Sequence, residues 1–151
     1  MKKSFSLVVL MALLVVALVS CNADKHVEDS VYGTWKTSYH SEANGYMITS
    51  NLRLAEDSSF TLVTTASIVN PALCRAYLLS LGTYDADDLD TQVELQEALA
   101  SEFSHVAYGT FVLTDTYVLL FVMEDGMSNE VPFVRGSDGT LHGANMTWKR
   151  V

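Results

Sequence analysis

The sequence predicts a mainly β fold, an antiparallel up-and-down β-barrel of about seven or eight strands with a helical insertion at about residues 70–104. Three observations predict this fold class. Segments of alternating apolar and polar residues are rich in β-branched and aromatic side chains. Turn residues separate these segments at roughly ten-residue spacing, which is typical of an antiparallel barrel. One stretch with helical periodicity interrupts this rhythm.

Three strands are expected before the insertion. Residues 31–40 are rich in β-branched and aromatic types, and Asn44-Gly45 is a strong hairpin signal. Residues 46–54 then alternate, and a third strand is expected over 60–69. The face of the second strand that we expect to lie toward the core carries Tyr46, Ile48, Ser50, Leu52 and Leu54.

Two helices are expected in the insertion. Asn70 is a good N-cap, Pro71 suits the first helical position, and Gly82 provides a C-terminal stop. A second helix is expected over 85–104, with Asp85, Asp87, Asp88 and Asp90 in its first turn, where the helix dipole favours negative charge. Its apolar face would carry Leu89, Val93, Leu99, Ala100 and Phe103.

Four strands are expected after the insertion, over residues 106–113, 117–123, 130–134 and 141–149. They bring the number of predicted strands to seven, and an eighth is expected in the segment before residue 31 or at an edge of the insertion. The barrel domain would then span 31–151, a length typical of one domain.

The N-terminus has the composition of an export signal. Lys2 and Lys3 precede an unbroken run of 13 apolar residues over 7–19, which is too short to span a bilayer comfortably. The run ends in Leu18-Val19-Ser20-Cys21, which resembles a bacterial lipoprotein signal. An ordinary secretory signal that happens to end near a cysteine is the alternative.

The lipoprotein resemblance implies that residues 1–20 are cleaved and that Cys21 carries acyl chains such as palmitate. Residues 21–30 would be the lipidated Cys and a flexible tether. The membrane would then be a partner through this lipid alone. In enteric bacteria, Asp after the Cys retains lipoproteins at the inner membrane, so Asn22 favours the outer membrane.

The acidic composition argues against nucleic-acid binding. Removal of the signal, with Lys2 and Lys3, leaves 7 basic and 18 acidic residues in 131, a formal charge of −11. Such a surface repels phosphate backbones. Cys74 has no intramolecular partner in the mature chain, and its apolar neighbours indicate a buried small side chain.

Gly33-Thr34-Trp35 near the mature start and Trp148-Lys149-Arg150 at the other end resemble the lipocalin superfamily, and more specifically the short lipocalin-like lipoproteins of bacteria. The resemblance implies that Gly33 and Trp35 lie at the closed end of the barrel. Arg150, or Lys149, would pack across the indole of Trp35, where cation–π attraction is favourable.

The aromatic residues are the remaining functional signal. If the helices fold over the barrel mouth, aromatics could line a cavity for a small apolar ligand, and the alternative is that they fill a solid core. The candidate ligand-binding residues are Tyr46, Phe60, Tyr77, Phe103, Tyr108, Phe111, Tyr117, Phe121 and Phe133.

No catalytic or metal-binding constellation is recognised in the sequence. The four histidines after the signal, His26, His40, His105 and His142, do not have metal-ligand spacing. The acidic run at 85–90 lacks the Gly and Glu of a calcium loop. We therefore expect a monomeric protein that binds a ligand without catalysis, cofactor or metal. The alternative is a protein-interaction or structural lipoprotein, for example an enzyme-inhibitor barrel, with a filled core.

Overall fold

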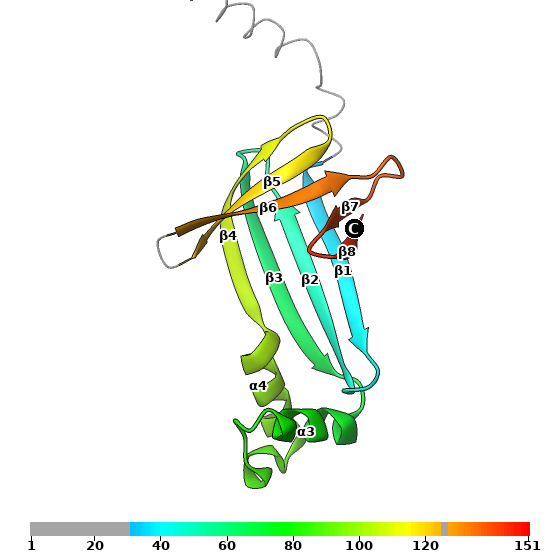
Figure 1. Ribbon diagram of the computed structural model, residues 1–151, viewed down its shortest axis with the longest axis vertical. Coiled ribbons are helices and arrows are strands. Elements are labelled where there is room, and N and C mark those ends of the chain that lie inside the picture. Colours follow the sequence, from blue (N-terminus) through cyan, green and yellow to red (C-terminus); the bar gives the residue numbers. More distant parts are fainter. Residues whose placement is uncertain (1–30, 125–126) are drawn as a thin grey trace, which may run out of the picture. The chain divides into compact units, whose positions relative to one another are not determined.

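The computed structural model describes residues 31–124 and 127–151, and the barrel unit spans Gly33–Val151. In the described part of the chain, eight antiparallel strands follow one another in sequence order and close into a barrel (Figure 1). This confirms the predicted fold class. The strands are β1 (Gly33–Ser41), β2 (Tyr46–Leu54), β3 (Ser59–Ile68), β4 (His105–Leu113), β5 (Tyr117–Glu124), β6 (Met127–Arg135), β7 (Leu141–Gly143) and β8 (Met146–Arg150).

The predicted signal over 1–20, the acylated Cys21 and the tether over 21–30 lie outside the described residues. The predicted strand boundaries agree with β2, β3 and β4 to within a few residues. No helix in the described part of the chain is long and apolar enough to cross a membrane.

The insertion lies between β3 and β4, as predicted. It contains α3 (Pro71–Ser80), the short 3₁₀ helix η1 (Ala86–Leu89) and α4 (Gln92–Phe103). The prediction of one continuous helix over 85–104 is wrong, because a new helix begins after Thr91. The hydroxyl of Thr91 accepts from the backbone N–H of Glu94 at 3.2 Å, and the Glu94 carboxylate accepts from the N–H of Thr91 at 2.8 Å. This reciprocal capping box starts α4.

The eighth strand lies neither before residue 31 nor at the insertion. The segment predicted as one strand over 141–149 is a hairpin of β7 and β8. Ala144 and Asn145 reverse the chain with positive φ angles of 53° and 59°. A two-residue hairpin turn demands this conformation, because its twist matches that of the flanking strands.

The strands pair over unequal lengths. β2 pairs along its full length with both β1 and β3. The seam between β1 and β8 has two residue pairs, Trp35 with Arg150 and Lys36 with Lys149. β4 pairs with β5 from Gly109 onward. Within the described residues, β1–β4 therefore continue past their last contact with β5–β8 as an open four-stranded sheet, which leads to α3 and α4 (Figure 1).

The buried side chains form two groups at opposite ends of this sheet. The barrel core consists of strand residues that are at most 3% exposed: Trp35, Leu52, Leu54, Phe60, Phe111, Val118, Leu120, Phe133, Leu141 and Trp148. The helical cluster joins the insertion to β2 and β3 through Tyr46, Ala66, Cys74, Leu78, Leu89, Leu95, Ala98 and Leu99.

Buried hydroxyl groups lie between the two groups along β1–β3. Thr37, Ser50 and Thr64 are each under 9% exposed and are adjacent in register. The hydroxyls of Ser50 and Thr64 hydrogen bond to each other at 3.0 Å, and that of Thr37 donates to the carbonyl of Thr147 at 2.9 Å. These bonds satisfy polar groups that would otherwise destabilise the interior.

Candidate functional site

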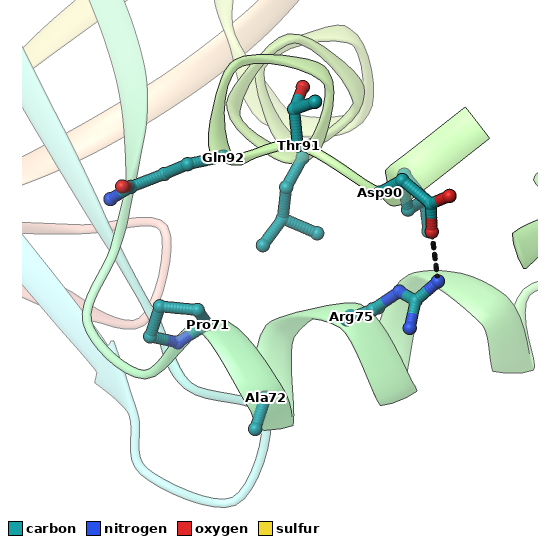
Figure 2. Close-up of a pocket in the computed structure, with 8 residues that line it drawn as sticks. Pro71, Ala72, Arg75, Asp90, Thr91 and Gln92 are labelled. Atoms are coloured by element: carbon teal, nitrogen blue, oxygen red, sulfur yellow. Dashed lines mark hydrogen bonds and ion pairs between the residues drawn. The ribbon is translucent and has the colours of Figure 1, made fainter. Parts of the chain in front are cut away.

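An open hollow of about 280 Å³ lies between α3 and the segment from η1 to the start of α4 (Figure 2). Its lining includes Leu89 and Leu95, which are members of the helical cluster. Pro71 and Ala72 contribute from the first turn of α3. The hollow therefore combines an apolar floor with walls from two separate helices.

The start of α3 is fixed by the adjacent hairpin turn. The Asn70 side chain accepts from the N–H of Leu73 at 3.3 Å, as an N-cap does. The N–H groups of Val69 and Asn70 both donate to the carbonyl of Gly45, at 2.8 and 2.9 Å. Gly45 has a φ of 69°, and a Cβ there would collide with the carbonyl oxygen of Asn70. Only glycine fits at position 45. The close contact that it allows between the turn and Asn70 fixes the start of α3, and with it Pro71 and Ala72 beside the hollow.

Arg75 forms the charged end of the hollow. Its Nη2 donates to the carbonyl of Ala86 and to Oδ1 of Asp90, both at 2.8 Å, and so ties α3 to η1 (Figure 2). Its Nε is buried and has no hydrogen-bond partner within the described residues. An unsatisfied buried donor of this kind costs free energy.

The other end of the hollow is the start of α4, where Thr91 and Gln92 line it (Figure 2). One turn further along, the Gln96 carboxamide binds the backbone of β3. It donates to the carbonyl of Ala66 at 2.9 Å and accepts from the N–H of Ile68 at 3.4 Å. β4 begins opposite Thr64, so Gln96 takes the place of a missing strand neighbour and fixes α4 against the sheet.

The nine aromatics predicted to bind ligand fall into three groups. Tyr46, Tyr77 and Phe103 come together at the helical end, with ring centroids 4.8 to 6.1 Å apart. Tyr46 is buried, whereas Tyr77 and Phe103 are half-buried and pack against the helical cluster. Burial and the nearby Tyr46 raise the pKa of Tyr77.

The other six aromatics lie elsewhere. Phe60, Phe111 and Phe133 are at most 3% exposed within the barrel core, and Phe133 packs edge-on against Trp148 at 5.5 Å. Tyr108, Tyr117 and Phe121 occupy positions that alternate with the inward residues of β4 and β5, so they point outward. Tyr108 is 68% exposed. Because successive side chains on a strand point to opposite faces of the sheet, the nine aromatic residues cannot line one cavity.

The residues of the predicted lipocalin-like motif meet at the seam. Arg150 lies directly opposite Trp35, which is 3% exposed. A Cβ on Gly33 would lie 3.3 Å from Nη2 of Arg150, so the guanidinium packs over this glycine, whose φ is 129°. Lys149 pairs with Lys36 on the opposite face of the sheet. The predicted cation–π contact with the indole stays a prediction.

Titratable groups are dispersed over the described part of the chain, and no three of its His, Cys, Asp and Glu residues are grouped as metal ligands. His142 hydrogen bonds through its two ring nitrogens to the hydroxyls of Thr140 and Thr147. Cys74 is fully buried, and burial raises the pKa of its thiol. A thiol in this environment is a poor nucleophile.

The hollow itself was not predicted from the sequence. The sequence did contain signals for the two helix starts that flank the hollow. These are Asn70-Pro71 at the start of α3, and Thr91 followed three residues later by Glu94 at the start of α4. The role of Arg75 had no local signal, because its partners Ala86 and Asp90 are brought to it by tertiary packing.

Comparisons with models of protein families, with curated proteins and with solved structures found no match for this chain.

Proposed function

We propose that the chain is an exported lipoprotein, anchored to the outer membrane through acyl chains on Cys21. Its lipocalin-like barrel would bind a small, largely apolar molecule at the helical end and would act without catalysis. Support for export and anchoring comes from Lys2, Lys3 and the apolar run that ends at Cys21. Support for the lipocalin-like assignment comes from the closed eight-stranded barrel and the meeting of Gly33, Trp35 and Arg150 at its seam.

The hollow between the helices favours the helical end over the barrel core as the ligand site. The barrel core is filled by side chains that are at most 3% exposed. The hollow has an apolar floor formed by Leu89 and Leu95 and a guanidinium group, that of Arg75, at one end. This combination is the observation that carries the proposal. Ligand sites typically combine an apolar lining with a few placed polar groups. The expected ligand is therefore a short apolar molecule that carries one acceptor group, such as a carboxylate.

Native mass spectrometry of the full chain, purified gently from its own host, tests the proposal directly. A small molecule that is lost on denaturation would give the ligand class. Calorimetric titration with octanoate, an apolar chain with one carboxylate, provides a defined probe.

Ala72→Leu should fill the hollow and weaken octanoate binding by about tenfold. Ala76→Leu is the matched control, because Ala76 is exposed on the same helix and does not line the hollow. Equal binding by the two variants, or no octanoate binding by the unmodified chain, would contradict this site.

A second candidate function, protein interaction, is favoured by a separate observation. Val106 and Tyr108 are 62% and 68% exposed, and within the described residues β4 has a strand neighbour only on its β3 side before Gly109. Exposed apolar side chains on such an edge favour pairing with another strand, here that of a second copy. A concentration-dependent dimer in sedimentation, lost in Val106→Lys, would support it, and a monomer at all concentrations would exclude it.

A further inference from the structure

The seam between β1 and β8 places two lysines side by side. Lys36 and Lys149 are directly opposite each other on neighbouring strands, and both are exposed. Like charges in this arrangement destabilise a sheet. Neither ammonium group makes an ion pair with an acidic side chain in the described part of the chain. This is unexpected in a protein with twice as many acidic as basic residues, 18 against 9.

A groove of about 380 Å³ lies beside this lysine pair. The groove arises where β8 separates from β1. The backbone pairing between the two strands ends at Lys36 and Lys149, and beyond it the hydroxyl of Thr37 donates a hydrogen bond to the carbonyl of Thr147. Ser38 and Thr147 also line the groove, and they lie two positions from Lys36 and Lys149 on the same face of their strands.

The groove offers an anion two ammonium groups. Beside them lie the hydroxyls of Ser38 and Thr147, which hydrogen bond to the hydroxyl of Thr49 and to Nδ1 of His142. The lining of the groove also includes Arg150 and Val151, and it contains no Asp or Glu side chain. In register, Asn51 lies opposite Lys36 on β2 and adds an amide to the same row. Two ammonium groups with adjacent hydroxyls suit a phosphate, whose several oxygens accept charge-assisted hydrogen bonds.

We propose that this groove, named the seam groove, binds a phosphate group through Lys36 and Lys149. The phosphate would belong to a lipid headgroup or to a soluble phosphorylated molecule. A bound phosphate would replace the repulsion between the two lysines by attraction to both. The site lies on the outer face of the seam and is separate from the hollow between the helices, so it does not rest on the function proposed above.

Calorimetric titration of the full chain in a neutral detergent tests the proposal with pyrophosphate as the probe. We expect saturable binding that the double variant Lys36→Gln/Lys149→Gln weakens by about tenfold. Binding should also weaken as salt is added, because both ammonium groups are exposed.

Arg53→Gln provides the charge-matched control for the single variant Lys149→Gln. Arg53 is an exposed cation on β2 that does not line the seam groove. The proposal requires that Lys149→Gln weakens binding and that Arg53→Gln leaves it unchanged. Equal effects of the two would assign binding to overall charge and overturn the site, as would a double variant that binds like the unmodified chain.

Dihexanoyl phosphatidylglycerol, as a monomer in the same titration, distinguishes the two sources of phosphate. Tighter binding of this short-chain lipid than of pyrophosphate would assign the seam groove to lipid headgroups, and the reverse order to soluble phosphorylated molecules. Both orders support a phosphate site, provided that the double variant abolishes the difference. Failure of both probes to bind would overturn it.

Discussion

The two ends of the barrel are stabilised in different ways. The barrel core is formed by strand residues whose inward positions alternate along the sequence, and each strand is hydrogen bonded to two others. The helical cluster is equally apolar at its centre, where Leu78 and Leu99 are fully buried. Its hydrogen bonds, however, come from individual side chains: Gln96 of α4 binds the backbone of β3, and Arg75 of α3 binds the backbone of η1 within the insertion.

From this difference we expect the helical end to open at a lower free energy than the barrel. Elements held by few hydrogen bonds unfold locally, whereas the central strands open only in global unfolding. A ligand site is more accessible in the region that opens locally.

Trp148→Ala should destabilise the whole domain by about 3–5 kcal/mol, because it leaves a large cavity in the barrel core. Trp148 is 1% exposed, and its indole N–H donates to the carbonyl of Gly143 at 3.2 Å. Urea unfolding followed by circular dichroism measures the change. Tyr108→Ala, on the outer face of the same barrel, should change stability by less than about 0.5 kcal/mol. Comparable effects of the two substitutions would refute the barrel core as described.

Leu99→Ala should destabilise the helical end by about 2–5 kcal/mol. Hydrogen exchange should accelerate in α3 and α4 while β1 and β2 stay protected. The buried thiol of Cys74 provides a second measurement, since it should react with a thiol reagent only after this end opens. Simultaneous loss of protection in β1 and β2 would show that the two ends unfold as one unit.

Gln96→Glu should weaken the attachment of α4 by about 1–3 kcal/mol. The carboxylate can still accept from the N–H of Ile68, but it cannot donate to the carbonyl of Ala66. Gln92→Glu, at the start of the same helix, is the control. Thermal unfolding and hydrogen exchange at Ala66 and Ile68 would detect the loss, and identical behaviour of the two variants would exclude the proposed role of Gln96.

Much of the fold could be predicted because alternation and turn residues are local signals. The strand at 46–54 and its Asn44-Gly45 turn follow from residue order alone. The break at Thr91 was missed, because the periodicity of apolar residues continues across it. The hairpin of β7 and β8 was missed for another reason: Ala144 and Asn145 are weak turn signals, and only cross-strand pairing forces their positive φ angles.

The candidate site was less predictable than the fold. Aromatic residues could be placed on strands, but the face of the sheet that each one occupies depends on strand register. On the neighbouring strands β3 and β4, Phe60 faces the core and is 2% exposed, whereas Tyr108 faces outward and is 68% exposed. Arg75 and Asp90 lie on different elements, and their ion pair at 2.8 Å exists only after α3 packs on η1. Contacts of this kind have no signature in a single sequence.

Thr91→Ala should destabilise α4 by about 1 kcal/mol, because it removes the hydroxyl that accepts from the N–H of Glu94 and donates to the Glu94 carboxylate. The backbone N–H of residue 91 still donates to that carboxylate. The substitution should also reduce the sensitivity of the helical end to acid. The backbone N–H of Thr91, and then its hydroxyl, hold the pKa of Glu94 below its ordinary value of 4.5. Such a carboxyl stabilises the fold above its unfolded pKa, and this contribution is lost as pH falls through the lower, folded value.

The acid sensitivity can be measured by unfolding the unmodified chain and Thr91→Ala at a series of pH values below 4.5. The stability difference between them should shrink as pH falls. A difference that is constant across this range would show that the hydroxyl of Thr91 does not lower the pKa of Glu94.

Lys36→Glu should stabilise the seam by about 0.2–1 kcal/mol, because it replaces a repulsive cross-strand pair with an attractive one. The gain should disappear at high salt, since both side chains are exposed. Lys36→Gln, which only removes the repulsion, should give a smaller gain. Thermal unfolding at two ionic strengths measures all three chains. A destabilised Lys36→Glu variant would show that Lys36 and Lys149 do not face each other.

The two-pair seam also has a consequence for the order of events in biosynthesis. β8 supplies Lys149 and Arg150, so the ring cannot close until these two residues have been synthesised. Until then β1 is a bare edge, open to pairing with other nascent chains, and its partner is the most distant strand in the sequence, which makes closure slow. A lysine in the middle of an edge strand discourages such pairing. Lys36 would therefore protect the unfinished barrel from aggregation.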